Sequence, residues 1–108
     1  MRGALLHNTG DETLEIVDDL TVADPGPGQV KIQIEATGVC HSDLHAMTGS
    51  LPQPAPVVLG HEGAGVITAV GAGVDNLVEG DHVIVAWSPP CGKCSMCVDH
   101  KSPHLCVM

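Results

Sequence analysis

The chain has 108 residues, 44% of them hydrophobic, and 13 acidic residues against four Lys and Arg give a net charge of −9. This length fits one domain with a modest core, and the charge argues against a nucleic-acid or anionic-membrane partner, because phosphate binding depends on clustered Lys and Arg. No apolar run approaches the roughly 20 residues that span a bilayer, and the apolar stretch within Met1–His7 is too short for a secretory signal. We therefore expect a soluble, cytoplasmic protein with no membrane partner.

The kind of apolar residue indicates a mainly β fold. Phe and Tyr are absent and Trp87 is the only aromatic residue, so Val, Ile, Leu and Ala must form the core. Among these, the β-branched residues favour strands. The 13 Gly and 8 Pro residues lie in short clusters between Val-rich runs. This arrangement is typical of many short strands joined by turns.

The first half of the chain begins with a predicted hairpin. Segments 2–7 and 13–20 are its two strands, and the Asn-Thr-Gly-Asp sequence at 8–11 is its turn. Apolar and polar residues then alternate over 30–37, which predicts a half-buried strand that ends at Gly38.

A short helix is predicted over 42–48, with Ser42 as its N-cap and Gly49 as its stop. Three more apolar runs after it are predicted to be strands: 57–59, 64–70 and 82–87. Regular periodicity stops beyond Pro90. The expected architecture is a small, partly open β-barrel with one short helix and a metal-bound loop.

Four of the five cysteines lie together in this final segment: Cys91, Cys94, Cys97 and Cys106. Four thiolates supply the closed tetrahedral shell of a structural zinc site, and a disulfide framework is disfavoured in a reducing compartment. An iron–sulfur cluster remains an alternative, because ferredoxins share the C-x2-C-x2-C opening, although the C-x3-C-P ending is missing. His100 and His104 lie in the same segment and are expected at the surface, since the four cysteines already fill the shell.

A second cluster combines Cys40 with His61. Both residues follow predicted strands, and a thiolate and an imidazole suit zinc, but a catalytic zinc ion needs three protein ligands. Asp43 or Glu62 would be a ligand or would orient His61 from behind. From the residues alone, a buried cysteine and a hydrogen-bonded histidine without a metal remain an equal alternative.

Two more histidines lie beside Cys40. His41 and His45 are four residues apart and share one face of the predicted helix, with Ser42 next to them. A hydroxyl group and a histidine near a Lewis-acidic metal can pass a proton from an alcohol to solvent. Without the metal, both histidines would simply be solvated.

The spacing Gly60-His61-Glu62-x2-Gly65-x5-Gly71-x2-Val74 resembles the signature of zinc-containing alcohol dehydrogenases. The segment 40–45, the Pro-rich stretch 52–56, the turn at 80–83 and the four-cysteine loop follow in that family's order. Over essentially all 108 residues, the chain resembles the N-terminal, GroES-like portion of a medium-chain zinc alcohol dehydrogenase. The resemblance implies one incomplete GroES-like domain over 1–108.

The resemblance also implies two zinc sites. Cys40 and His61 would be ligands of the catalytic zinc ion, Glu62 would approach that ion and coordinate it transiently, and Asp43 would fix His61. The structural zinc ion would be held by Cys91, Cys94, Cys97 and Cys106. Eight residues separate the last two cysteines where the family commonly has seven, a difference that a loop absorbs.

For catalysis, the resemblance implies that Ser42 hydrogen-bonds to the alcohol oxygen and that His45 is the outer member of a proton relay. His41 would contact the pyrophosphate of NAD. The complete enzyme would oxidise an alcohol to an aldehyde or ketone, or catalyse the reverse, as a homo-oligomer.

The family's third catalytic ligand and its Rossmann domain lie beyond this chain, which contains no G-x-G-x-x-G between a strand and a helix. The isolated chain is therefore expected to bind zinc without turnover. A stand-alone zinc-stabilised module and, less favoured, an iron–sulfur redox protein remain alternatives. Trp87 is expected in the core or at an interface rather than in a substrate pocket.

Overall fold

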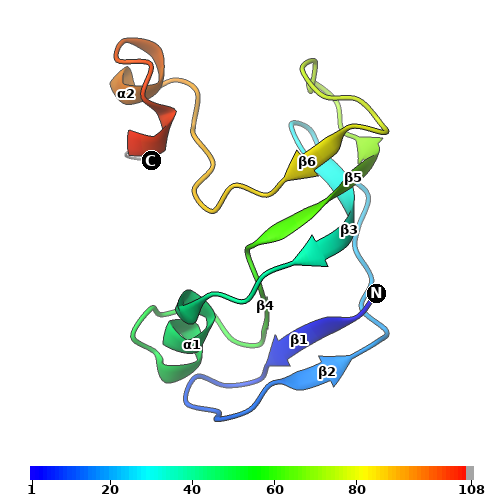
Figure 1. The fold of residues 1–108 in the computed structure, drawn as a ribbon, viewed down its shortest axis with the longest axis vertical. Coiled ribbons are helices and arrows are strands. Elements are labelled where there is room, and N and C mark those ends of the chain that lie inside the picture. The colour runs from blue at the N-terminus through cyan, green and yellow to red at the C-terminus, as the bar shows by residue number, and fades with distance from the viewer. Residues whose placement is uncertain (107–108) are drawn as a thin grey trace.

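The computed structural model describes residues 1–106 and has a mainly β fold with open sheets, which confirms the predicted fold class (Figure 1). One sheet has the strand order β2-β1-β4 and the other β3-β5-β6, and every described strand pair is antiparallel. The strands are β1 (Gly3–Leu6), β2 (Glu15–Val17), β3 (Val30–Thr37), β4 (Val57–Leu59), β5 (Gly63–Val70) and β6 (His82–Ile84). The helices are α1 (His41–Thr48), α2 (Ser95–Val98) and the 3-10 helix η1 (Pro103–Leu105).

The predicted N-terminal hairpin is confirmed as β1 and β2, although both strands are shorter than the sequence pattern indicates. Its turn is closed by Asp11, whose Oδ2 accepts the N–H of Asn8 at 2.8 Å. The N–H of Asp11 donates in return to the Asn8 carbonyl at 3.2 Å. This reciprocal pairing is the reason that Asn and Asp favour such turns.

Strand β3 forms over the predicted residues, but the predicted alternation of burial is wrong. Its second half is exposed throughout, and the side chain of Ile34 is 40% exposed. The pairing with β5 shifts register between Lys31 and Ile32 and again between Ile34 and Ala36. Each register shift interrupts the two-residue period, so a strict alternation of faces cannot persist along the strand.

The central strand β5 depends on a close approach of backbones at Gly65. A Cβ atom at this position would overlap the carbonyl group of Gln33 and lie 3.0 Å from the Cα atom of Ile34. Only glycine fits there, because the obstacle is backbone. The buried hydrophobic residues of the described chain are Leu6, Ala46 and Ile67, a small core contributed by β1, α1 and β5.

Helix α1 begins one residue earlier than predicted, and the N-cap is Cys40 rather than Ser42. Cys40 has extended backbone angles, and its N–H donates to Oδ2 of Asp43 at 3.3 Å, so the Asp43 carboxylate fixes the start of the helix. The predicted stop is confirmed at Gly49, whose φ of 80° is in the left-handed region that glycine tolerates. The Gly10 N–H also donates to the Met47 carbonyl at 2.7 Å, which ties the hairpin turn to the end of α1.

The last strand, β6, ends at Ile84, so the prediction of a strand through Trp87 is wrong. The Gly63 carbonyl still accepts the Val85 N–H at 2.8 Å, but the chain then leaves the sheet. Figure 1 shows the segment beyond β6 projecting away from both sheets to α2 and η1, two short helical turns that the sequence pattern did not predict. No helix in residues 1–106 is long and apolar enough to cross a bilayer.

Candidate functional site

Three potential metal ligands meet where α1 begins and β5 is about to start. Cys40 is the N-cap of α1, whereas His61 and Glu62 lie in the connection from β4 to β5. One ligand atom from each residue lies within 4.8 Å of the other two. The strand pairing between β3 and β5 accounts for this proximity, because Thr37 at the end of β3 pairs with Gly63 at the start of β5.

His61 is arranged as a metal-ligating histidine whose second ring nitrogen faces a carboxylate. Its Nδ1 lies 3.3 Å from Oδ1 of Asp43, and its buried Nε2 makes no hydrogen bond to any residue that the structure describes. A buried ring nitrogen with no hydrogen bond is costly. A metal ion at Nε2 would satisfy it, and a carboxylate behind the other nitrogen is the usual support for a ligating histidine.

The surroundings of the Cys40 thiol favour its ionised form. The Ser42 backbone N–H, then the Ser42 hydroxyl group, then the His61 ring hold the pKa of Cys40 below its ordinary value, although burial and the Glu62 charge oppose them. Ser42 Oγ lies 3.5 Å from the sulfur. The contact with Cys40, helped by the charge of Asp43 and opposed by burial, raises the pKa of His61. The thiolate is the form that ligates metals.

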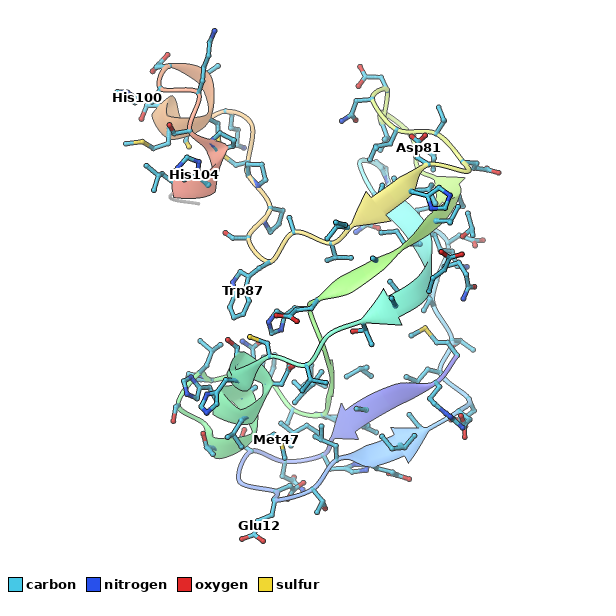
Figure 2. The ribbon with its side chains drawn as sticks, in the orientation of Figure 1. Glu12, Met47, Asp81, Trp87, His100 and His104 are labelled. Atoms are coloured by element: carbon cyan, nitrogen blue, oxygen red, sulfur yellow. The ribbon has the colours of Figure 1, made fainter. Side chains whose placement is uncertain are left out.

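A cavity of about 280 Å³ opens beside this cluster, and its lining includes Ser42, Asp43, His61, Leu51 and Trp87. Trp87 is 55% exposed, so of its two expected places, the core or an interface, the core is wrong. Its indole meets the His61 ring edge-on, with ring centroids 4.2 Å apart. Figure 2 shows Trp87 reaching from the segment after β6 toward the side of the molecule that carries α1.

The two histidines of α1 do not line this cavity. His41 and His45 are exposed, and their rings meet edge-on with centroids 4.7 Å apart. Ser42 does line the cavity, and His45 follows it three residues later on the same helix. Residues three apart are neighbours on a helix surface, so the cavity-lining Ser42 and the exposed His45 lie next to each other on α1.

The four cysteines of the final segment converge separately. Sulfur atoms of Cys91, Cys94, Cys97 and Cys106 all lie within 4.8 Å of one another. The Cys94 sulfur is 3.6 Å from that of Cys97 and 3.9 Å from that of Cys106. Partial burial, and then the Cys94 thiol, raise the pKa of Cys97 to about 11. His100 and His104 are exposed, as predicted (Figure 2).

From the sequence, Gly38 was expected only to end a strand. In the structure, the Gly38 N–H donates to the Glu62 carbonyl at 2.9 Å, and the Glu62 side chain lies against the Gly38 backbone. No sequence signal could have shown this contact, because it depends on the register between β3 and β5.

Residues 26–108 match the family model of the alcohol dehydrogenase GroES-like domain. The chain belongs to this family, as an N-terminal segment of the zinc-type, medium-chain alcohol dehydrogenases. The open, mainly β architecture described above is therefore the GroES-like fold that the resemblance implied.

Among its relatives is alcohol dehydrogenase B of Mycobacterium tuberculosis, 51% identical over 82 residues that cover 75% of this chain and 22% of the relative. S-(hydroxymethyl)glutathione dehydrogenase of Candida maltosa is 46% identical over 91 residues, 83% of this chain and 24% of the relative. The chain thus spans slightly less than a quarter of the length of these curated relatives.

Solved structures of two other enzymes have folds similar to that of this chain. Benzyl alcohol dehydrogenase from Acinetobacter calcoaceticus superposes with a TM-score of 0.82 at 36% identity, over 98% of this chain and 28% of that chain. Acetophenone reductase from Geotrichum candidum, solved in complex with NAD, superposes with a TM-score of 0.78 at 40% identity, over 99% of this chain and 31% of that chain.

Proposed function

We propose that this chain supplies the zinc-binding, substrate-side segment of an NAD-dependent alcohol dehydrogenase. The complete enzyme oxidises an alcohol to an aldehyde or ketone, or catalyses the reverse reaction. The observation that carries the proposal is the convergence of Cys40, His61 and Glu62 beside a cavity that Ser42 also lines. Two of the proteins named above, alcohol dehydrogenase B and benzyl alcohol dehydrogenase, are alcohol dehydrogenases by name, which supports the same reaction class.

The donor set suits a catalytic zinc ion. Cys40 supplies a thiolate, His61 supplies Nε2, and the carboxylate of Glu62 is close enough to reach the same ion. Bound there, zinc would act as a Lewis acid that makes an alcohol hydroxyl group easier to deprotonate. Asp43 would hold His61 in the tautomer that leaves Nε2 free to coordinate.

The other residues of α1 would bind the alcohol and move its proton. Ser42 would accept a hydrogen bond from the alcohol at the cavity wall, and the proton would pass through Ser42 and His45 to solvent. The hydride would leave the substrate carbon for the nicotinamide ring of NAD, so the alcohol loses one hydride and one proton. The exposed His41 at the start of α1 would contact the cofactor pyrophosphate.

The four-cysteine cluster would hold a structural zinc ion. Metal–sulfur bonds of about 2.3 Å in a tetrahedron place the sulfur atoms about 3.8 Å apart, close to the 3.6 and 3.9 Å distances from Cys94. A multi-iron cluster inserts inorganic sulfide and several metals between the thiolates, which would require wider separations. The spacing therefore supports a single ion.

The chain would function as part of a longer polypeptide, with residues 1–108 as an incomplete GroES-like domain. Within residues 1–106 the strand pairs are all antiparallel, so this part of the protein offers no parallel sheet of the kind that binds dinucleotides. The third cysteine ligand and the NAD domain would come from elsewhere in the polypeptide. The full-length enzyme would be a cytoplasmic homo-oligomer, in a compartment that keeps these thiols reduced.

Native mass spectrometry of the purified chain tests the two metal sites. We expect one tightly held zinc ion that Cys97→Ser removes, and a second ion, taken up on titration, that Cys40→Ser removes. Visible absorbance from iron, or no uptake that depends on Cys40, would contradict the proposal.

The intact mass of the native polypeptide in its source cells tests the larger claim. A mass several times 11.1 kDa would support a whole dehydrogenase. A mass near 11.1 kDa would instead favour a stand-alone zinc-stabilised module.

A further inference from the structure

Gly38 lies where the two segments that carry the candidate ligands come together. Gly38 precedes Cys40 by two residues. Its N–H donates to the carbonyl group of Glu62 at 2.9 Å. Beyond this hydrogen bond, the Glu62 side chain crosses directly over the Gly38 backbone. A Cβ atom at Gly38 would overlap Oε2 of Glu62 and lie 3.3 Å from both Cβ and Cδ of that side chain.

The backbone does not itself require glycine at this position. Gly38 is absent from the glycines of the described chain that have positive φ, such as Gly49 and Gly60. A side chain at Gly38 would therefore cause no backbone strain of the left-handed kind. What glycine provides here is space, and the space is occupied by the carboxylate of Glu62.

The carboxylate that occupies this space lies close to both candidate ligands. With Gly38 in place, a carboxylate oxygen of Glu62 lies within 4.8 Å of the Cys40 sulfur and of a ring nitrogen of His61. We propose that Gly38 is a positioning residue that, by having no side chain, holds the Glu62 carboxylate against the metal bound by Cys40 and His61. The inference rests on the proposed function, because it assumes that those two residues bind a metal ion.

The contact predicts a selective effect rather than unfolding. The atom nearest to the added methyl group would be the far end of a flexible, exposed side chain, which can rotate away. Gly38→Ala would therefore displace the carboxylate while the Gly38–Glu62 backbone hydrogen bond and the β3–β5 pairing persist. Removing a group that supports a metal site typically weakens metal binding about tenfold or more.

Cobalt(II) tests this inference because its visible absorption reports the ligands. The chain is first loaded with one equivalent of zinc, and Co²⁺ is then titrated; the absorbance that Cys40→Ser abolishes belongs to the Cys40–His61 site. Gly38→Ala and Glu62→Gln should each weaken Co²⁺ binding about tenfold. The double variant should be no weaker than Glu62→Gln alone, because Gly38 acts only through the carboxylate.

Gly26→Ala is the matched control. A Cβ atom there would likewise meet the end of a flexible side chain, at 3.2 Å from Oε1 of Gln29, and its φ is not in the positive range either. Gly26 does not line the cavity beside the candidate site. Its Co²⁺ affinity should equal that of the wild type.

Each outcome has a distinct meaning. If the wild-type chain shows no absorbance that depends on Cys40, the proposed function fails. If it does show that absorbance and Gly38→Ala binds Co²⁺ normally, the role of Gly38 is wrong while the metal site stands. Weakening that persists in the Glu62→Gln background, or loss of folding by Gly38→Ala, would also overturn the inference, because either would show an effect on more than the carboxylate.

Discussion

Asp43 Oδ1 lies 3.3 Å from Nδ1 of His61, while the second oxygen of the same carboxylate accepts the N–H of Cys40 at 3.3 Å. One side chain therefore fixes both the N-terminus of α1 and the orientation of the His61 ring. This explains how residues from different parts of the sequence come to face a common point. It also makes Asp43 the residue through which a change in the helix would reach the candidate metal site.

Asp43→Asn should weaken metal binding at Cys40 and His61 by about 10- to 100-fold. The amide keeps the shape of the side chain but removes the charge that supports His61. A Co²⁺ titration of the zinc-loaded chain measures the change. Asp18→Asn is the control, since Asp18 carries an exposed ion pair with Arg2 at 2.6 Å. Equal affinities for both variants and the wild type would refute the role of Asp43.

Trp87 should report metal binding through its fluorescence. It is the only aromatic residue of types Phe, Trp and Tyr, and its ring centroid is 4.2 Å from that of His61. Co²⁺ has a partly filled d shell that quenches a nearby indole, whereas d¹⁰ zinc does not. Titration with Co²⁺ should therefore quench the emission in the wild type, and Cys40→Ser should abolish the quenching. Unchanged emission at saturating Co²⁺ would show that Trp87 is not beside the metal.

Zinc binding to the four-cysteine cluster should strengthen as the pH rises. The pKa of Cys97 is raised to about 11, so this thiol carries a proton at neutral pH. A zinc-bound thiolate has lost that proton, and zinc affinity should therefore rise about tenfold per pH unit for each proton displaced. Competition with a chelator between about pH 6 and pH 8 measures the slope. An affinity independent of pH in this range would contradict thiol ligation.

Loss of that zinc ion should unfold the cysteine loop while leaving the sheets folded. Helices α2 and η1 pack on each other, and the segment that carries them projects away from the strands (Figure 1). In the Cys97→Ser variant, amide hydrogen exchange should speed up over residues 91–106 and stay slow in β3 and β5. Equally fast exchange in β5 would show that the loop supports the whole fold.

Gly65→Ala should destabilise the chain by about 1–3 kcal/mol or more, the usual cost of overpacking. The added methyl group would meet the backbone of Gln33 and Ile34, which cannot rotate away. Gly63→Ala in the same strand is the comparison, because its nearest contacts are side-chain atoms, Ile34 Cδ1 at 3.0 Å and Val85 Cγ2 at 3.4 Å. Urea denaturation should show the larger loss for Gly65→Ala. The reverse order would be inconsistent with the described packing.

Local sequence patterns predicted most of the elements. Asn8 and Asp11 make the hairpin turn by bonding to each other, and Gly49 stops α1 by adopting a left-handed conformation. Such effects act over a few residues, so a sequence reveals them. The register shifts inside β3 were not predictable, because they depend on how β3 pairs with β5, a strand about 30 residues further along the chain.

The candidate ligands were also visible in the sequence, since thiols and imidazoles with metal-site spacing are uncommon without a role. The geometry of these ligands could not be predicted from the sequence. That Asp43 caps α1 and also faces His61 depends on where β5 begins relative to the helix. The position of Trp87 depends on the path of the chain after β6, which no periodicity marks.

The hydrogen bond from the Gly10 N–H to the carbonyl group of Met47 limits how the length of the hairpin turn can change. Exposed turns of small polar residues ordinarily accept insertions. The turn at residues 8–11 is different, because an added residue would move the Gly10 N–H away from the end of α1. An eight-residue helix has little stability of its own and depends on such ties. A loop inserted at this turn should therefore displace the helix that carries Ser42 and His45, more than 30 residues further along the sequence.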